Sequence, residues 1–251
     1  MTERVIPIII TTPRTGSYVF TNQIYNIYKH FNIVKSNLLE YFTIIKHYES
    51  HYAYIDNVLA KVSHVARRSK WFDNARDIKL QRLDVLKNDP NYLIKLFLGQ
   101  CEPEVVDFVS AYYKPIYLER NNKVAQILSA CSINSNPAHY NNSNTIAEKF
   151  MYDRTMVDYI LRELEKYYQF KSSNESITFY YEELLKVNFS QDYICHKLDL
   201  PIIDVRYNIE TVATPYSGNN IEDNIINIEE WNRDKEWLIS ELSKYGDSNP
   251  S

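Results

Sequence analysis

The sequence predicts an α/β fold in which a mostly parallel central sheet is flanked by helices. Short apolar, β-branched runs alternate with amphipathic segments, and the connections between successive strands are too long for hairpins. The 251 residues are 45% hydrophobic and 24% charged, which is enough apolar material for a sizeable core in a globular protein. We expect residues 1–251 to form one domain.

The strands are expected where β-branched or aromatic runs end in turn residues. Residues 5–11 form the first such run, which stops at a proline-containing turn. Similar runs fall within 88–99, at 114–119 and from residue 176 onward.

The helices are expected where apolar residues recur every three or four positions. From Ser17 the spacing of Phe20, Ile24, Ile27 and Phe31 places these four side chains on one helix face. Further helices are expected at residues 55–68, 101–113, 121–132, roughly 145–168, 190–201 and 229–245. The polar stretches 133–146 and 202–227 are expected to be surface loops.

The composition argues against several classes of protein. The net charge of −4 gives no broad basic field, so no nucleic-acid partner is expected. Cys101, Cys131 and Cys195 show no zinc-ligand spacing and no disulfide framework, which indicates a reducing, cytoplasmic environment. No apolar run approaches the roughly 18 residues that a membrane span needs. The oligomeric state is not predicted.

The turn Thr12-Pro13-Arg14-Thr15-Gly16-Ser17 connects the first strand to the first helix. The first N–H groups of a helix lack partners within the helix, and the helix dipole adds partial positive charge there. Gly16 allows a close backbone approach, Thr15 and Ser17 offer hydroxyl groups, and Arg14 can bind two anionic oxygens. The turn therefore suits a phosphate or sulfate group. The alternative is an ordinary turn with Ser17 as the N-cap.

This turn is not a Walker A loop. That motif places Lys and then Ser or Thr directly after its last glycine, whereas Gly16 is followed by Ser17 and Tyr18. The loop can bind an anion, but it lacks the usual arrangement for Mg²⁺.

The stretch "TTPRTGSYVF" resembles the 5′-phosphosulfate loop of sulfotransferases that use 3′-phosphoadenosine 5′-phosphosulfate (PAPS). It is most similar to the bacterial trehalose-sulfotransferase type, with its P-R-[ST]-G-S-[ST]-x-L pattern. The resemblance implies a P-loop-like, three-layer sulfotransferase fold. It also implies that the PAPS phosphosulfate lies on the loop residues Arg14, Thr15, Gly16, Ser17 and Tyr18.

Two further segments extend the resemblance. In this family, a strand ends in Arg, and a Ser about two helical turns later helps to hold the 3′-phosphate; Arg120 and Ser129 match these positions. Arg120 also lies at the C-terminal edge of a predicted strand, where open α/β sheets bind ligands. The family's Y-E-[DE]-L segment and L-G-L-like turn appear as 181–184 and 198–200, with Asp199 where the family favours Gly.

A fourth segment, Glu40-Tyr41-Phe42, matches the trehalose type, in which this Glu is the proposed base. The Gly and Pro that precede it in the family are Asn37 and Leu38 here, which puts the shape of the loop in doubt. Glu40 is therefore a candidate catalytic base, and a solvated turn residue is the alternative.

The resemblance implies transfer of a sulfuryl group from PAPS to a hydroxyl or amine of a small-molecule or glycan acceptor, without a metal. Arg14 and Glu40 would be the catalytic residues, and 3′-phosphoadenosine 5′-phosphate would be the product. A P-loop-type phosphotransferase and a non-catalytic nucleotide- or glycan-binding relative remain alternatives. Arg154 lies on the apolar stripe of its predicted helix, where we expect an ion pair with Glu182 or Glu183.

Overall fold

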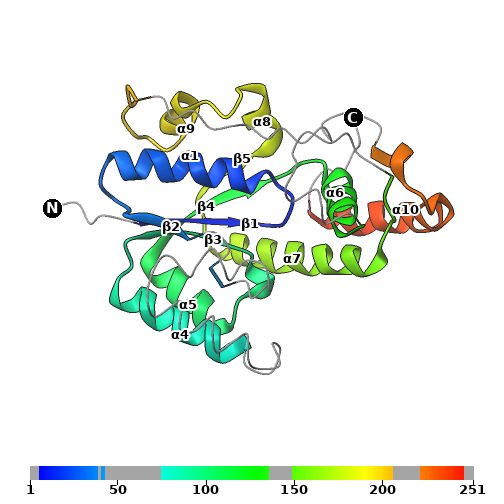
Figure 1. Ribbon diagram of the computed structural model, residues 1–251, viewed down its shortest axis with the longest axis horizontal. Coiled ribbons are helices and arrows are strands. Elements are labelled where there is room, and N and C mark those ends of the chain that lie inside the picture. Colours follow the sequence, from blue (N-terminus) through cyan, green and yellow to red (C-terminus); the bar gives the residue numbers. More distant parts are fainter. Residues whose placement is uncertain (1–5, 39–40, 43–74, 136–148, 206–220, 246–251) are drawn as a thin grey trace.

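The computed structural model describes residues 6–38, 41–42, 75–135, 149–205 and 221–245. At its centre is a five-stranded sheet in the order β2–β3–β1–β4–β5, and each neighbouring pair of these strands is parallel (Figure 1). The strands are β1 (Ile6–Thr11), β2 (Ser36–Leu38), β3 (Tyr92–Leu96), β4 (Tyr113–Glu119) and β5 (Ile177–Tyr180). The predicted α/β fold with a parallel sheet is confirmed.

The central strands are apolar because helices cover both faces of the sheet. All six residues of β1 and all five of β3 are buried. Strands buried on both faces are nearly continuous runs of hydrophobic residues, rather than alternating ones. The isoleucines of β1 therefore pack on both sides of the sheet, and the strand ends where the polar turn begins.

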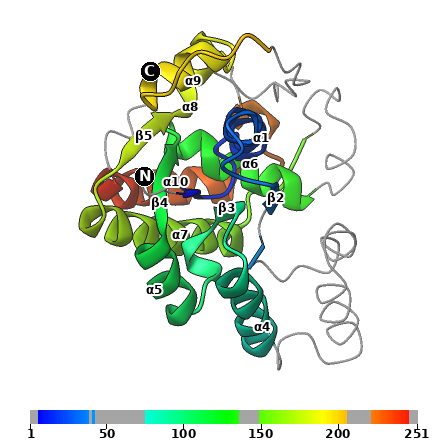
Figure 2. The same ribbon diagram turned by 90° about the vertical axis from the view of Figure 1, so that its left-hand side faces the viewer.

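The helices form a layer on each face of the sheet. The helix α1 lies with α8 and α9 on one face, and α4, α5 and α7 lie on the other, while α6 and α10 lie toward the end where β1 and β4 finish (Figures 1 and 2). The α-helices are α1 (Ser17–His30), α4 (Ala75–Asn88), α5 (Pro103–Tyr112), α6 (Lys123–Ser135), α7 (Arg154–Ser173), α8 (Tyr181–Lys186), α9 (Gln191–Lys197) and α10 (Ile228–Leu242). Short 3₁₀ turns are η1 (Leu98–Gln100), η3 (Ile221–Asn224) and η4 (Ser243–Tyr245).

The buried apolar side chains form two clusters. The larger one surrounds the sheet and includes residues of all five strands and of α1, α5 and α9. The second is built mainly by α6, α7 and α10 around the fully buried Trp231. The helix α6 contributes to this second cluster and also follows β4 directly, so its position at the end of the sheet is fixed by packing.

Most predicted elements are present, with differences at their ends. The helix expected at roughly 145–168 begins at Arg154, because the side chain of Asp153 caps it by accepting from the amides of Thr155 (2.9 Å) and Met156 (3.4 Å). The elements β2 and α4 were not predicted. The helix expected at 55–68 lies outside the described residues.

The predicted partners of Arg154 were wrong. Its guanidinium group donates to Asp234 (2.9 Å) and Asp158 (3.3 Å), and it lies over the ring of Trp237. The side chain is half exposed, because Arg154 is the first residue of α7 rather than an interior position of a longer helix. It therefore forms an ion pair at the surface instead of a buried one.

Candidate anion site at the end of the sheet

Hydrogen bonds from threonine hydroxyl groups fix the conformation of the loop between β1 and α1. Thr11 Oγ1 donates to the carbonyl of Leu118 on β4 (2.9 Å), and Thr15 Oγ1 donates to the carbonyl of Thr12 (3.0 Å). The hydroxyl groups of Thr11 and Thr15 lie 2.6 Å apart. Gln126 of α6 links the loop to this helix, because its Nε2 donates to Thr12 Oγ1 (2.7 Å) and to the carbonyl of Pro13 (2.6 Å).

The loop backbone takes the left-handed conformation at two residues, Arg14 (φ 65°) and Gly16 (φ 73°). Turns of this kind form concave anion-binding sites when they precede a helix, because backbone N–H groups then converge. Gly16 is the N-cap residue of α1 and has no side chain with which to occupy the first turn. Gly16 therefore takes the positive φ that the sequence analysis allowed for, and binding of an anion by the loop stays a prediction.

The ring of Tyr181 also leaves no space for a side chain at residue 16. A Cβ atom at residue 16 would lie 2.5 Å from the ring of Tyr181, which is too close for any side chain. The same ring lies under the guanidinium group of Arg120, with 5.1 Å between Cζ and the ring centroid. Tyr181 thus links the loop to the end of β4.

Arg14, Arg120 and Ser129 meet beside this loop. Arg14 Nε donates to Ser129 Oγ on α6 (3.2 Å), and Arg120 Nη1 donates to the carbonyl of Arg14 (3.3 Å). Residues separated by more than 100 positions in the chain are therefore neighbours, as a shared ligand site requires. Their roles as ligand contacts remain predictions.

Arg120 is buried with incomplete hydrogen bonding. Its side chain is 7% exposed, and among the described residues no hydrogen-bond partner reaches its buried Nε. Burial lowers the pKa of Arg120 from its ordinary value, while Tyr181 and Glu182 oppose that change. Arginine stays protonated in proteins, so an orphaned donor on this buried cation is a costly feature that an anionic ligand would relieve.

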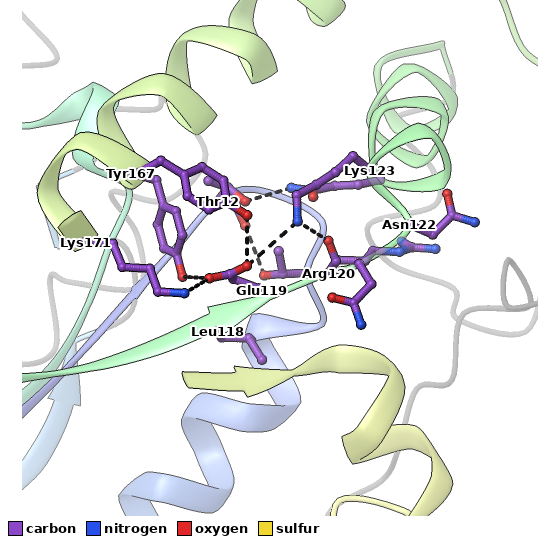
Figure 3. Close-up of polar contacts among 12 residues, drawn as sticks. Thr12, Leu118, Glu119, Arg120, Asn122, Lys123, Tyr167 and Lys171 are labelled. Carbon is purple, nitrogen blue, oxygen red and sulfur yellow. Dashed lines mark hydrogen bonds and ion pairs between the residues drawn. The ribbon is translucent and has the colours of Figure 1, made fainter. Parts of the chain in front are cut away.

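The residue before Arg120 anchors the end of β4. Glu119 is buried and accepts hydrogen bonds from Tyr168 (2.8 Å), Tyr167 (3.3 Å) and Lys171 of α7. Lys123 lies between the Glu119 carboxylate and the carbonyl of Arg120 (Figure 3). Two ammonium groups and two hydroxyl groups therefore engage the Glu119 carboxylate.

The Y-E-E-L segment also positions the site. The carboxylate of Glu182 accepts from the backbone amides of Asn121 (3.0 Å) and Asn122 (3.2 Å), which form the turn between β4 and α6. Glu182 therefore fixes the turn that follows Arg120. The later L-D-L turn has Asp199 at φ 55°, a left-handed conformation, which explains why glycine suits this position.

The other predicted site residues have different surroundings. The hydroxyl of Thr15 is directed into the loop itself, whereas that of Ser17 lies 3.4 Å from Nζ of Lys95 on β3. Tyr18 is 60% exposed at the first turn of α1. Glu40 lies outside the described residues.

Sequence reasoning missed Lys95, Gln126 and the contact role of Tyr181. Gln126 could have been found, because it lies one helical turn before Ser129 and so shares its helix face. Lys95 gave no such signal, since a lysine in "YLIKLF" resembles a surface residue of an edge strand.

Two absences can be stated for the described ranges. No helix in them is both long enough and apolar enough to cross a membrane. Nor do three or more His, Cys, Asp or Glu side chains gather there in a group that could hold a metal ion.

Comparison with known proteins gives only distant similarity. No family model matches the chain, and no curated protein matches it. Among solved structures, the chain is similar to the shikimate kinase from Bacteroides thetaiotaomicron, with a TM-score of 0.47 and 15% identity over 78% of this chain and 99% of that one. It is also similar to the shikimate kinase from Aquifex aeolicus, with a TM-score of 0.45 and 12% identity over 78% of this chain and 96% of that one.

Proposed function

We propose that the chain is a nucleotide-dependent transferase that moves the sulfuryl group of PAPS to a hydroxyl or amine acceptor. The observation that carries the proposal is the cluster of Arg14, Arg120 and Ser129 beside a glycine loop at the ends of parallel strands. Arg14 in the loop and Arg120 at the end of β4 can each bind one anionic group of a donor that carries two. PAPS has such groups in its 5′-phosphosulfate and its 3′-phosphate.

Each end of the donor has its own contacts in this proposal. The loop amides from Arg14 to Tyr18 and the Arg14 guanidinium bind the phosphosulfate. Arg120 and Ser129 bind the 3′-phosphate, and the orphaned Nε of Arg120 supplies a donor for it. The buried position of Arg120 strengthens that contact, because water screens it poorly.

The transfer follows from holding both reactants in line. The acceptor oxygen or nitrogen attacks sulfur, its bond to sulfur forms, and the bond from sulfur to the bridging oxygen of the 5′-phosphate breaks. 3′-Phosphoadenosine 5′-phosphate leaves, and the acceptor's proton passes to a base, for which Glu40 is the candidate. Arg14 and the loop amides stabilise the negative charge that develops on the leaving phosphate.

A phosphotransferase is the second candidate, because a strand, a glycine turn and a helix also form the phosphate site of P-loop kinases. Its usual metal arrangement does not fit these residues. The position that supplies a Mg²⁺-binding Ser or Thr is Tyr18, and Lys95 approaches the loop from β3.

One experiment separates the two candidates. The protein is incubated with sulfur-labelled PAPS and a cell extract in excess EDTA, and in parallel with phosphorus-labelled ATP and Mg²⁺. We expect labelled sulfate to appear on an acceptor in EDTA, and thermal unfolding to shift upward with 3′-phosphoadenosine 5′-phosphate. Transfer of phosphate from ATP alone, abolished by EDTA, would replace the sulfotransferase proposal with the second candidate.

A further inference from the structure

Lys95 is an unusual residue for its place in the fold. It lies in β3, between β2 and β1, so it is not on an edge of the sheet. The side chain is 3% exposed, and the other four residues of the strand are apolar or aromatic and buried. Lysine is almost never fully buried unless a partner of suitable charge or polarity stabilises its ammonium group.

The ammonium group of Lys95 reaches the first turn of α1. Lys95 pairs with Ile9 in the parallel register of β3 and β1, so it lies near the C-terminal ends of the strands, where β1 passes into the loop. Its Nζ donates to Ser17 Oγ (3.4 Å), and Ser17 is the first residue of α1. The N-terminus of α1 carries partial positive charge and therefore repels the Lys95 ammonium group. An anion bound between the helix N-terminus and the ammonium group would be attracted by both.

Ser17 also occupies an informative position in the loop. In a Walker A loop, the residue after the last glycine is the lysine that reaches the phosphates. Here that residue is Ser17, and the ammonium group of Lys95 approaches the Ser17 hydroxyl from the neighbouring strand.

We propose that Lys95 binds the same anionic group as the loop, namely the 5′-phosphate or phosphosulfate of the donor. It supplies from β3 the lysine that the loop sequence lacks after Gly16. This inference rests on the proposed function for the identity of the donor, but it requires only that the loop binds a phosphate-like anion. With Lys95 and Arg14 on the 5′ end and Arg120 on the 3′ end, each end of the donor meets a cation that the protein itself provides.

The test compares ligands that have and lack a 5′-phosphate. Calorimetric titration measures binding of 3′-phosphoadenosine 5′-phosphate, adenosine 3′-phosphate and inorganic pyrophosphate to the wild-type protein and to Lys95→Met. We expect Lys95→Met to weaken binding of the bisphosphate and of pyrophosphate about 10- to 100-fold, as for loss of a charge-assisted contact, and to leave adenosine 3′-phosphate unaffected. Lys95→Arg, which keeps the charge, should restore part of the loss.

Lys114→Met is the matched control. Lys114 is an exposed lysine near the N-terminal end of β4, paired with Pro7, and so lies at the end of the sheet away from the loop. It should bind all three ligands as the wild-type protein does. If Lys95→Met does not fold, Lys95→Gln makes the same test, since its amide can still donate to Ser17 but carries no charge.

The outcomes distinguish this inference from the proposed function. Equal binding of pyrophosphate by the wild-type protein and by the Lys95 variants would overturn the role of Lys95, even if PAPS proves to be the donor. Pyrophosphate binding that depends on Lys95, without any preference of the wild-type protein for the bisphosphate over AMP in a parallel titration, would support Lys95 and refute PAPS as the donor. A wild-type protein that binds neither pyrophosphate nor the bisphosphate would overturn both.

Discussion

Glu163 makes the stability of this fold depend on pH in a direction that is unusual for a carboxylate. Its side chain is 2% exposed on α7, and it accepts a hydrogen bond from the amide of Gly99 just after β3 (2.9 Å). Burial raises the pKa of Glu163 to about 7, and the Gly99 hydrogen bond and nearby cations, Lys166 foremost, only partly oppose this. The folded protein therefore keeps a proton that the unfolded chain releases near its ordinary pKa of 4.5.

The sign and size of the effect follow from that difference. Between pH 4.5 and about 7 the folded state binds more protons than the unfolded state, so the free energy of unfolding falls as the pH rises through this window. The difference of about 2.5 between the two pKa values corresponds to ~3 kcal/mol at about 1.4 kcal/mol per unit. Glu163→Gln removes the titration and keeps an oxygen that can accept from Gly99.

The assay is urea denaturation of the wild-type protein and Glu163→Gln at several pH values between 4 and 8. We expect the variant to gain about 3 kcal/mol relative to the wild type between the two ends of this range, with little change above pH 7.5. Glu165→Gln, at an exposed position on the same helix, is the control for loss of a carboxylate that is not buried. A difference between the wild type and Glu163→Gln that stays constant with pH would refute the argument that Glu163 is buried as a neutral acid.

Three further predictions concern the candidate site. Gly16→Ala should lower the free energy of unfolding by at least about 1–2 kcal/mol, measured by urea denaturation, because φ is positive and the Tyr181 ring blocks a Cβ atom; an unchanged value would contradict this. Arg120→Ala should remove ~1.5–3 kcal/mol of the preference for 3′-phosphoadenosine 5′-phosphate over AMP in calorimetry, whereas a wild-type protein without that preference would disprove the assignment. Glu40→Gln should lower turnover ~10²-fold or more at nearly unchanged donor affinity, and normal turnover on the natural acceptor would make Glu40 a loop residue.

The sheet could be predicted from the sequence because its central strands are buried on both faces. Continuous β-branched runs such as that of β1 are distinctive, and polar turns mark their ends. The strand β2 was missed since it has only three residues, too few to show a pattern. The helix α4 was missed because its sequence, ARDIKLQRLDVLKN, is mostly polar and has only a weak apolar face.

The site was only partly predictable, and the reason is tertiary. Local sequence identified the loop around Gly16 and the strand end at Arg120, because glycine and arginine at strand ends suit ligand binding in any open α/β sheet. The approach of Lys95 to Ser17 depends on the pairing of β3 with β1, which no local pattern encodes. The contact of Tyr181 with Gly16 likewise appears only when β5 and α8 are placed beside the loop.

The chain as a whole carries a net charge of −4. The positive charge of the site therefore depends on which groups its acidic residues bind. Two carboxylates lie close to Arg120 in sequence or space, and either could neutralise it. Glu119 is bound instead by Lys171 and the tyrosines of α7, and Glu182 by two backbone amides of the turn before α6. Among the described residues, no hydrogen-bond partner reaches the buried Nε of Arg120, so this donor is available to a ligand. Glu182 still favours the charged form of Arg120, but among the described residues neither carboxylate forms a direct ion pair with it. The missing ion pair is the strongest physical reason to regard Arg120 as a binding residue.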